Sequence, residues 1–358
     1  MAKTIPQLTE LFKRELEMCD VTPDETVLVV SQAESREPYI EAFKNAAEVI
    51  GSTVSHLELP GLKHPMFPYG GSPDSMPLSD VDEHIQNDPA ARGALENSDF
   101  VVDLTAEGLI HTKARTLTLE NGARMISCWE PASILEQMFP REDLRERVET
   151  AEQMVIDADE MRVTSKAGTD VTVEVGQDPP TVPQYGYTDE PGRWDHFVSG
   201  FIAFYPVDGS QNGKIVLDAG DVILPLRRYV DNPIEFTLED GFITDIDGDG
   251  ADCALIESYL EMWDDEDAYA ASHFGWGMDE TASWENIAAY ATTGVDARGT
   301  NNRSQIGNFM WSTGPNRFVG RDTRAHLDFP MRNCTVSLDG EVVVEDGDVV
   351  DSRLTPNR

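Results

Sequence analysis

Three residues in the C-terminal part of the chain have the side chains that hold a redox-active metal. His326 and Asp328 form a His-x-Asp pair, and His273 precedes it. Two imidazoles and one carboxylate can occupy one face of an octahedral Fe(II) ion and leave the opposite face open for substrate and dioxygen. This donor set predicts a mononuclear non-haem iron site and therefore oxidative chemistry.

The spacing of His326 and Asp328 suits a strand, because residues i and i+2 of an extended chain point to the same side. The segment from Arg324 to Pro330 is predicted to be extended, so both side chains would face one ion. His273 lies among small residues and glycines, which permit the close backbone approach that a ligand from another element needs. A surface pair in an acid-rich chain is the alternative reading of His-x-Asp.

The chain is strongly acidic. Its 358 residues include 66 Asp and Glu against 27 basic residues, of which 7 are Lys and 20 Arg, and the net charge is −39. The hydrophobic content of 40% is that of a folded protein rather than of a disordered acidic chain. Concentrated salt screens charges over a few ångströms, so the composition predicts a halophilic protein. No basic patch is available to neutralise phosphates, which argues against nucleic acid as a partner.

Cysteine usage and hydropathy predict a cytoplasmic protein. Cys19, Cys128, Cys253 and Cys334 have no C-x-x-C spacing, which argues against a zinc knuckle or a disulfide framework and predicts free buried thiols. Charges interrupt the apolar N-terminal positions, and no stretch approaches the roughly 20 apolar residues of a membrane span. We therefore expect no membrane partner.

Residues 1–155 are predicted to form an α/β domain. A buried strand over 26–30, an amphipathic helix over 36–50 and a second strand over 54–59 give a β-α-β unit. Further strands and helices are expected over 99–104, 124–128, 131–139 and 141–160. No G-x-G-x-x-G occurs, so a nucleotide role has no support.

Residues 156–358 are predicted to form a β-rich α+β domain. Short alternating strands are separated by turn signals such as Asp208-Gly209 and Asn212-Gly213. Strands are expected over 171–175, 201–204, 214–217 and 341–344, and a helix over 255–267. The run 245–250 begins like a calcium loop, but its twelfth position is Ile256 instead of the required Glu, so an acidic turn is preferred and calcium is not predicted.

The segment 185–200 combines side chains suited to a ligand site. It is rich in aromatic residues and glycine, and it carries Arg193, Trp194 and His196 side by side. A planar substrate can stack on the ring while the polar groups fix its orientation, so we expect Arg193 and Trp194 to bind substrate. A structural role for His196 is the equally weighted alternative to a functional one. His111 follows a strand end, where open α/β sheets face their ligand crevice, and is a second candidate.

Several segments together carry a resemblance to a known family. They are Pro191-Gly-Arg-Trp-Asp-His196, Ala271-Ser-His-Phe-Gly-Trp-Gly277, Gly307-Asn308, Gly314-Pro-Asn316 and His326-Leu-Asp-Phe-Pro-Met-Arg-Asn-Cys-Thr-Val-Ser-Leu-Asp-Gly340. They resemble 2,5-dihydroxypyridine 5,6-dioxygenase, an iron oxygenase of nicotinate catabolism on the scaffold of metallo-aminopeptidases such as aminopeptidase T. The resemblance covers most of the chain and is densest in the C-terminal half. It implies the iron ligands His273, His326 and Asp328.

The resemblance also implies a reaction and its partners. Fe(II) would bind a hydroxylated pyridine and dioxygen, and both oxygen atoms would enter the cleaved bond, giving an N-formylmaleamate-type product. His196 and His111 would then be substrate contacts or proton shuttles, because imidazole titrates near neutral pH. Trp194 and Trp276 would stack on the ring, with a core role as the alternative for either. Family members are homo-oligomeric, and we expect the same here.

Two other functions stay open. Peptide hydrolysis by a related aminopeptidase would need a co-catalytic zinc or cobalt pair with further carboxylate ligands, for which Glu257, Glu261 and Glu280 are available. The family pattern of those peptidases has a tyrosine soon after the first histidine, and residues 274–283 contain none, which favours the oxygenase. A metal-binding protein without catalysis is the third alternative.

Overall fold

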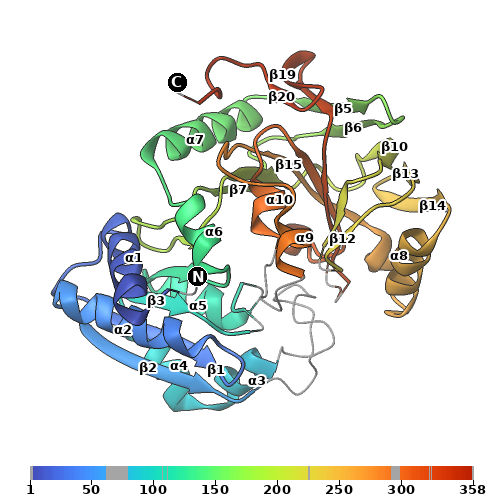
Figure 1. Cartoon of the computed structure of the whole chain (residues 1–358). Helices are drawn as coiled ribbons and strands as arrows, with labels where there is room; N and C mark the ends of the chain where they lie inside the picture. Colours follow the sequence, from blue (N-terminus) through green and yellow to red (C-terminus); the bar gives the residue numbers. More distant parts are fainter. Residues whose placement is uncertain are drawn as a thin grey trace. The chain divides into compact units, whose positions relative to one another are not determined.

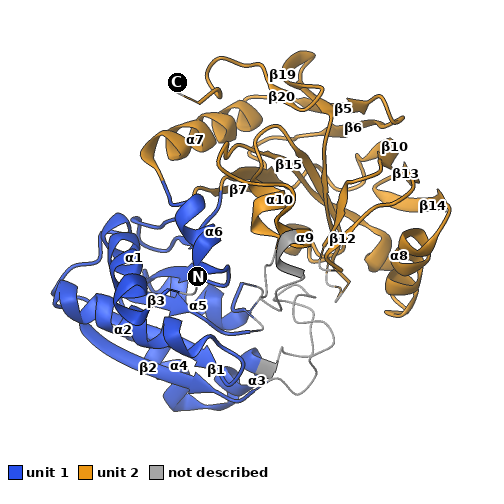
Figure 2. Cartoon of the chain, viewed as in Figure 1, with its two compact units in different colours: residues 1–140, 186–199 blue, residues 141–185, 200–358 orange. Residues whose placement is uncertain are grey.

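The computed structural model of the chain (Figure 1) describes residues 3–61, 80–106, 108–110, 112–224, 226–291, 299–321, 323 and 325–356. The chain divides into two compact units (Figure 2). The first comprises residues 1–140 and 186–199, and the second residues 141–185 and 200–358. The expected class, an α/β unit followed by a β-rich unit, is confirmed.

The first unit is built on a five-stranded sheet in which every neighbouring pair is parallel, with the order β2-β1-β3-β4-β8. The strands are β1 (Thr26–Gln32), β2 (Thr53–Leu59), β3 (Phe100–Asp103), β4 (Arg124–Ser127) and β8 (Trp194–His196). Strands β1, β3 and β4 are almost continuous runs of buried residues, as expected for a parallel sheet that is covered on both faces. Edge strand β2 is mostly exposed.

Helices flank these strands in the sequence. They are α1 (Ile5–Met18), α2 (Glu37–Ile50), α3 (Asp80–Asn87), α4 (Pro89–Glu96), α5 (Lys113–Glu120) and α6 (Ala132–Gln137). Helices α2 and α5 contact the sheet. The rings of Phe12 and Phe43 stack with centroids 3.9 Å apart, which joins α1 to α2. Helix α2 ends at Gly51, whose φ of 104° is the left-handed conformation that glycine adopts most readily.

The division differs from the predicted boundary at residue 155 in two places. Helix α7 (Glu142–Ile156) belongs to the second unit, and the segment 186–199 returns to the first. This return is caused by β8, which pairs in parallel with β4 and places Trp194 beside Met125 and His196 beside Ser127. The sequence predicted only a loop here, because a strand of three residues is too short to show a period.

The second unit contains two large antiparallel sheets and a two-stranded one. The larger has the order β14-β13-β10-β6-β5-β18-β19-β20, and the smaller β17-β16-β15-β9-β7. The larger comprises β5 (Glu160–Ser165), β6 (Asp170–Glu174), β10 (Asn212–Leu217), β13 (Ile234–Glu239), β14 (Phe242–Gly248), β18 (Cys334–Leu338), β19 (Glu341–Glu345) and β20 (Asp348–Val349). The smaller comprises β7 (Thr181–Gln184), β9 (Phe201–Phe204), β15 (Ala271–Gly277), β16 (Phe309–Thr313) and β17 (Asp328–Met331).

Short elements complete the second unit, among them the hairpin β11 (Val222–Ile223) and β12 (Arg228–Tyr229) and the helices α8 (Ala251–Glu261), α9 (Asn286–Ala291) and α10 (Thr300–Ser304). Two 3-10 turns, η1 (Glu266–Tyr269) and η2 (Arg317–Val319), occur as well. The two sheets meet where Phe236 of β13 contacts Trp311 of β16 and Phe329 of β17, with ring centroids 5.3 and 5.4 Å apart. These aromatic contacts anchor β17, which begins at the predicted ligand Asp328, and the neighbouring strand β16.

Two expectations about the whole chain can be compared with the structure. All four cysteines are free and buried, as the sequence predicted. None of the helices that the structure describes is both long and apolar enough to cross a membrane.

Candidate metal centre

Two of the three predicted ligands lie in the smaller sheet of the second unit, and the third lies just before one of its strands. Strand β15 carries His273, β17 begins at Asp328, and β16 lies between these two strands. His326 lies two residues before β17, so the regular strand begins later than the predicted start at Arg324. The His-x-Asp spacing nevertheless brings both side chains to one place.

Two local features let these side chains meet across β16. Ser312 of β16 pairs directly with Asp328, and directly paired residues present their side chains on the same face. The small serine therefore leaves room above it. The register of β15 shifts between Ala271 and Phe274, so His273 and the residue before it lie opposite the single Ser312. Such a bulge re-aims a side chain, and the His273 N–H donates to Ser312 Oγ over 3.1 Å.

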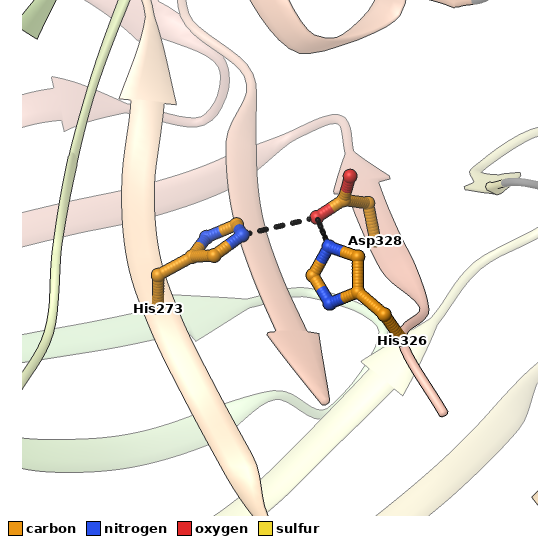
Figure 3. Close-up of side chains that lie close together, drawn as sticks. All are labelled: His273, His326 and Asp328. Atoms are coloured by element: carbon orange, nitrogen blue, oxygen red, sulfur yellow. Dashed lines mark ion pairs between the residues drawn. The ribbon is translucent and has the colours of Figure 1, made fainter. Parts of the chain in front are cut away.

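The imidazoles of His273 and His326 point at the same carboxylate oxygen (Figure 3). Nε2 of His273 lies 3.1 Å from Asp328 Oδ1, and Nε2 of His326 lies 3.5 Å from it. The potential ligand atoms of the three residues all lie within 4.8 Å of one another. Asp328 Oδ1 is buried, and no N–H or O–H of the described residues is aligned to hydrogen-bond to it. Such an orphaned oxygen facing two ring nitrogens is what a bound cation would satisfy.

Hydrogen bonds orient the other sides of these groups. Nδ1 of His326 lies 2.9 Å from the carbonyl oxygen of Thr313 and donates to it, so Nε2 carries the lone pair that a metal needs. Nη1 of Arg303, on α10, lies 3.2 Å from Asp328 Oδ2. Because Arg303 occupies Oδ2, Oδ1 is the oxygen left for an ion.

The electrostatics favour the metal-binding protonation states. Burial raises the pKa of Asp328, but its interactions with His326, His273 and Arg303 outweigh burial and hold the pKa far below its ordinary value. Burial lowers the pKa of His326. The carboxylate is therefore ionised at neutral pH, and His326 is favoured in its neutral form, as metal binding requires.

The described residues supply ligands for a single ion. Within the described ranges, no other His, Cys, Asp or Glu joins the three in a metal-binding group. Glu257 and Glu261 are exposed on α8, and the exposed Glu280 pairs with Arg141 and Arg147. None of the three acids considered for a second metal belongs to the cluster. Two imidazoles and one carboxylate fit a divalent transition metal such as Fe(II), and they lack the carboxylate bridge of a co-catalytic pair.

His196 ends β8 at the carboxyl end of the parallel sheet in the first unit, and the indole of Trp194, the first residue of β8, reaches Ser127 there. The imidazole of His196 contacts the rings of Trp129 and Trp194 edge to face, with centroids 4.9 and 4.5 Å apart. Nε1 of Trp194 donates to Ser127 Oγ over 3.0 Å, and Ser127 Oγ donates to Asp103 Oδ2 over 2.9 Å. This edge of a parallel sheet is where ligands bind in open α/β folds.

The remaining predicted site residues have different environments. The guanidinium of Arg193 donates to the Tyr187 carbonyl and pairs with Asp195. Trp276 is completely buried in β15, which favours its core role. His111 lies outside the described residues. Arg193, Trp194 and His196 belong to the first unit and the metal cluster to the second, so their roles toward a substrate stay predictions.

Sequence reasoning missed the residues that support the cluster. Arg303, Ser312 and Thr313 contact the ligands through a side-chain ion pair, a main-chain hydrogen bond and a ring hydrogen bond. Their separation from the ligands along the sequence follows no recognisable motif. Only the strand pairing of β16 and the placement of α10 bring them there.

The fold and the cluster define a class of two-unit proteins with a His-His-Asp group in a β-rich unit. Residues 7–351 match the model of the NicX family, 2,5-dihydroxypyridine 5,6-dioxygenase. The match spans nearly the whole chain, and this chain belongs to that family. The 2,5-dihydroxypyridine 5,6-dioxygenase of Pseudomonas putida KT2440 is 38% identical over 346 residues, which are 96% of each chain.

Solved structures give the same result. The structure of 2,5-dihydroxypyridine dioxygenase from Pseudomonas putida KT2440 superimposes with a TM-score of 0.90 at 36% identity, over 99% of this chain and 100% of that one. Wild-type AmpT from Thermus thermophilus superimposes with a TM-score of 0.57 at 10% identity, over 96% and 98% of the chains. At that identity the second likeness shows a shared fold alone, and it confirms the predicted aminopeptidase T-like scaffold.

Proposed function

We propose that this chain is an Fe(II)-dependent ring-cleaving dioxygenase that acts on 2,5-dihydroxypyridine or a closely related hydroxylated pyridine. Its membership of the 2,5-dihydroxypyridine 5,6-dioxygenase family supports the reaction and the substrate class. The observation that carries the iron assignment is the convergence of His273, His326 and Asp328 around one orphaned carboxylate oxygen. This donor set is the facial triad of non-haem Fe(II) oxygenases.

The protein part of the reaction follows from these residues. Nε2 of His273, Nε2 of His326 and Oδ1 of Asp328 would hold the ion, which, when bound, makes electron transfer between the aromatic ring and triplet dioxygen feasible. Three protein ligands on one side leave the other positions for substrate and dioxygen. Arg303 keeps Oδ2 engaged, and the Thr313 carbonyl keeps His326 in the tautomer that binds through Nε2.

Proton handling and substrate orientation are assigned to residues outside the metal cluster. We keep His196 and His111 as proton donors or acceptors and Arg193 and Trp194 as substrate-binding residues. The hydrogen bond from Trp194 to Ser127 holds the indole in one orientation, as a stacking surface requires. Replacement of His196 by Gln should lower kcat while the iron content stays at one equivalent, and an unchanged kcat would leave His196 a structural role.

Oxygen consumption tests the proposed reaction. The protein is reconstituted anaerobically with Fe(II) in molar KCl and screened with hydroxylated pyridines and dihydroxybenzenes in an oxygen electrode. We expect one iron per chain and one dioxygen consumed for each 2,5-dihydroxypyridine cleaved. Release of leucine from leucyl-peptides with zinc or cobalt, and no oxygen uptake, would instead establish the aminopeptidase. Inactivity in both assays would leave a metal-binding protein without catalysis.

Two further properties belong to this proposal. The net charge of −39 and the excess of Arg over Lys support an enzyme adapted to high salt. We expect activity and folding to require KCl well above 0.15 M. At about 0.15 M the screening length is still about 8 Å, so the acidic side chains would repel one another. We also propose a homo-oligomer, and light scattering on the folded protein in molar KCl tests that.

A further inference from the structure

His326 differs from the other two predicted ligands in how its main chain is held. His273 lies within β15 and Asp328 within β17, whereas His326 lies outside the described strands. The residues that follow it are tied to neighbouring chain. The Leu327 carbonyl accepts from the Thr313 N–H over 2.9 Å, and Asp328 exchanges two main-chain hydrogen bonds with Leu224.

A single side chain makes the hydrogen bonds that hold the main chain of His326. The hydroxyl of Tyr259, on α8, accepts from the His326 N–H over 3.1 Å and donates to the His326 carbonyl over 3.1 Å. A phenol can make both bonds at once, because its oxygen is an acceptor and its O–H a donor. One hydroxyl therefore holds both main-chain polar groups of a predicted metal ligand.

The imidazole ring of His326 is held as well. Nδ1 of His326 donates to the Thr313 carbonyl of β16, so the ring is fixed by the smaller sheet and the main chain by α8. These contacts together set the direction of Nε2 toward Asp328 Oδ1, 3.5 Å away. Loss of the hydroxyl would leave two main-chain groups without partners, and the segment would shift to satisfy them with water.

Helix α8 itself does not depend on this hydroxyl for its place. Ile256 and Leu260 are fully buried on the same helix. Near the start of α8, the carboxylate of Asp252 accepts from Arg228 Nε over 2.6 Å and from the Asp231 N–H over 3.0 Å. The ring of Tyr259 also contacts Trp263 edge to face with centroids 5.9 Å apart. Phenylalanine would keep this ring contact and, of the contacts with Trp263, lose only the hydrogen bond to the hydroxyl.

We propose that Tyr259 is a positioning residue of the metal centre, whose hydroxyl fixes the main chain of His326 and thereby aims its Nε2 at the metal. This rests on the proposed function only in that the three residues bind a divalent ion. It does not depend on which substrate is cleaved. Groups that hydrogen-bond to a metal ligand and orient it commonly change metal affinity about 10- to 100-fold when they are removed.

Metal affinity tests this inference without an activity assay. The dissociation constant for Zn(II) is measured by competition with a chelator, in molar KCl, for the wild type and for Tyr259→Phe. We expect Tyr259→Phe to bind Zn(II) at least tenfold more weakly. The visible spectrum of Co(II)-loaded protein should change as well, because it reports the geometry around the ion.

Tyr39→Phe is the matched control. Tyr39 is a buried tyrosine of the first unit, and its hydroxyl donates to the Glu130 carbonyl over 3.0 Å. This control also loses a buried phenol hydrogen bond, and we expect its thermal stability to fall while its Zn(II) affinity and Co(II) spectrum stay those of the wild type. A merely structural role for Tyr259 predicts the same behaviour in both variants.

The outcomes separate this inference from the proposed function. Equal Zn(II) affinity in Tyr259→Phe and the wild type overturns the positioning role and leaves the dioxygenase proposal intact. Failure of Tyr259→Phe to fold in molar KCl also overturns it, because the hydroxyl would then be needed for folding. A wild type that binds no divalent ion would overturn the proposed metal site itself.

Discussion

Two buried aspartates, one in each unit, show how differently a carboxylate can be used. Asp103 ends β3 in the first unit, and it accepts hydrogen bonds from the N–H and hydroxyl of Thr105, from the Leu109 N–H and from Ser127 Oγ. Asp328 begins β17 in the second unit, and no donor of the described residues is aligned with its Oδ1. Two imidazole nitrogens face that oxygen instead.

The difference separates a structural carboxylate from a ligand. The chain satisfies Asp103 completely with its own donors, and the result is an ordered turn after β3. At Asp328 the chain provides only Arg303 for Oδ2 and leaves Oδ1 among groups that are themselves electron-pair donors. A buried carboxylate oxygen left in this state needs positive charge beside it, and two imidazoles placed with it favour a metal ion, so the missing donor marks the site more clearly than burial does.

The largest effect should follow from removing the ligands. Replacement of Asp328 or His326 by Ala removes one of three donors, and we expect the iron content to fall from one equivalent per chain to none while the fold is kept. Replacement of Asp103 by Ala should leave the iron content at one equivalent per chain. Metal analysis after anaerobic reconstitution measures both. Iron retained in both ligand variants would refute the ligand assignment, and iron lost from the Asp103 variant would break the comparison.

The second prediction concerns the pH dependence of stability. Burial raises the pKa of Asp103 despite its hydrogen bonds, whereas the pKa of Asp328 is lowered because its interactions with His326, His273 and Arg303 outweigh burial. A carboxyl group whose pKa is raised in the folded state gives stability that is present below about pH 4. This stability is lost as the pH rises through the pKa of the folded state. A carboxyl group whose pKa is lowered gives stability that is present above about pH 4 and lost as the pH falls.

Urea unfolding of chelator-treated protein between about pH 3 and pH 7 tests these opposite signs. The loss of unfolding free energy caused by Asp103→Asn should become smaller as the pH rises. The loss caused by Asp328→Asn should become smaller as the pH falls. Each slope is at most about 1.4 kcal/mol per pH unit, the value for one proton. Slopes of the same sign in the two variants would show that the aspartates do not differ in the way described.

Much of the fold could be predicted because its strongest signals are local. The run Thr26–Gln32 is apolar and β-branched, and Glu37–Ile50 has helical spacing closed by Gly51, so β1 and α2 were predicted within a few residues. Strand β8 was missed, because its three residues form a strand only through pairing with β4. For the same reason, the single predicted boundary near residue 155 placed residues 186–199 in the second unit, whereas they belong to the first.

The site was predictable only in its ligands. His326 and Asp328 are two positions apart, and this spacing is visible in the sequence. The groups that support them, such as Tyr259 and Arg303, are set by tertiary packing of α8 and α10 and leave no local pattern. Sequence reasoning therefore finds donor atoms more readily than it finds the residues that aim them.

A pair of Ser→Ala variants gives the smallest and most specific test. Ser127→Ala removes the link between Trp194 and Asp103 and should cost about 1–3 kcal/mol of unfolding free energy with no change in Zn(II) affinity. Ser312→Ala removes one hydrogen bond from the His273 N–H, so it should cost about 0.5–1.5 kcal/mol and weaken Zn(II) binding a few-fold. Chemical unfolding and chelator competition measure the two quantities. Each variant loses only a hydroxyl. A Zn(II) response at Ser127 would contradict the structural role given to the Asp103 network, and no response at Ser312 would show that its hydrogen bond does not orient His273.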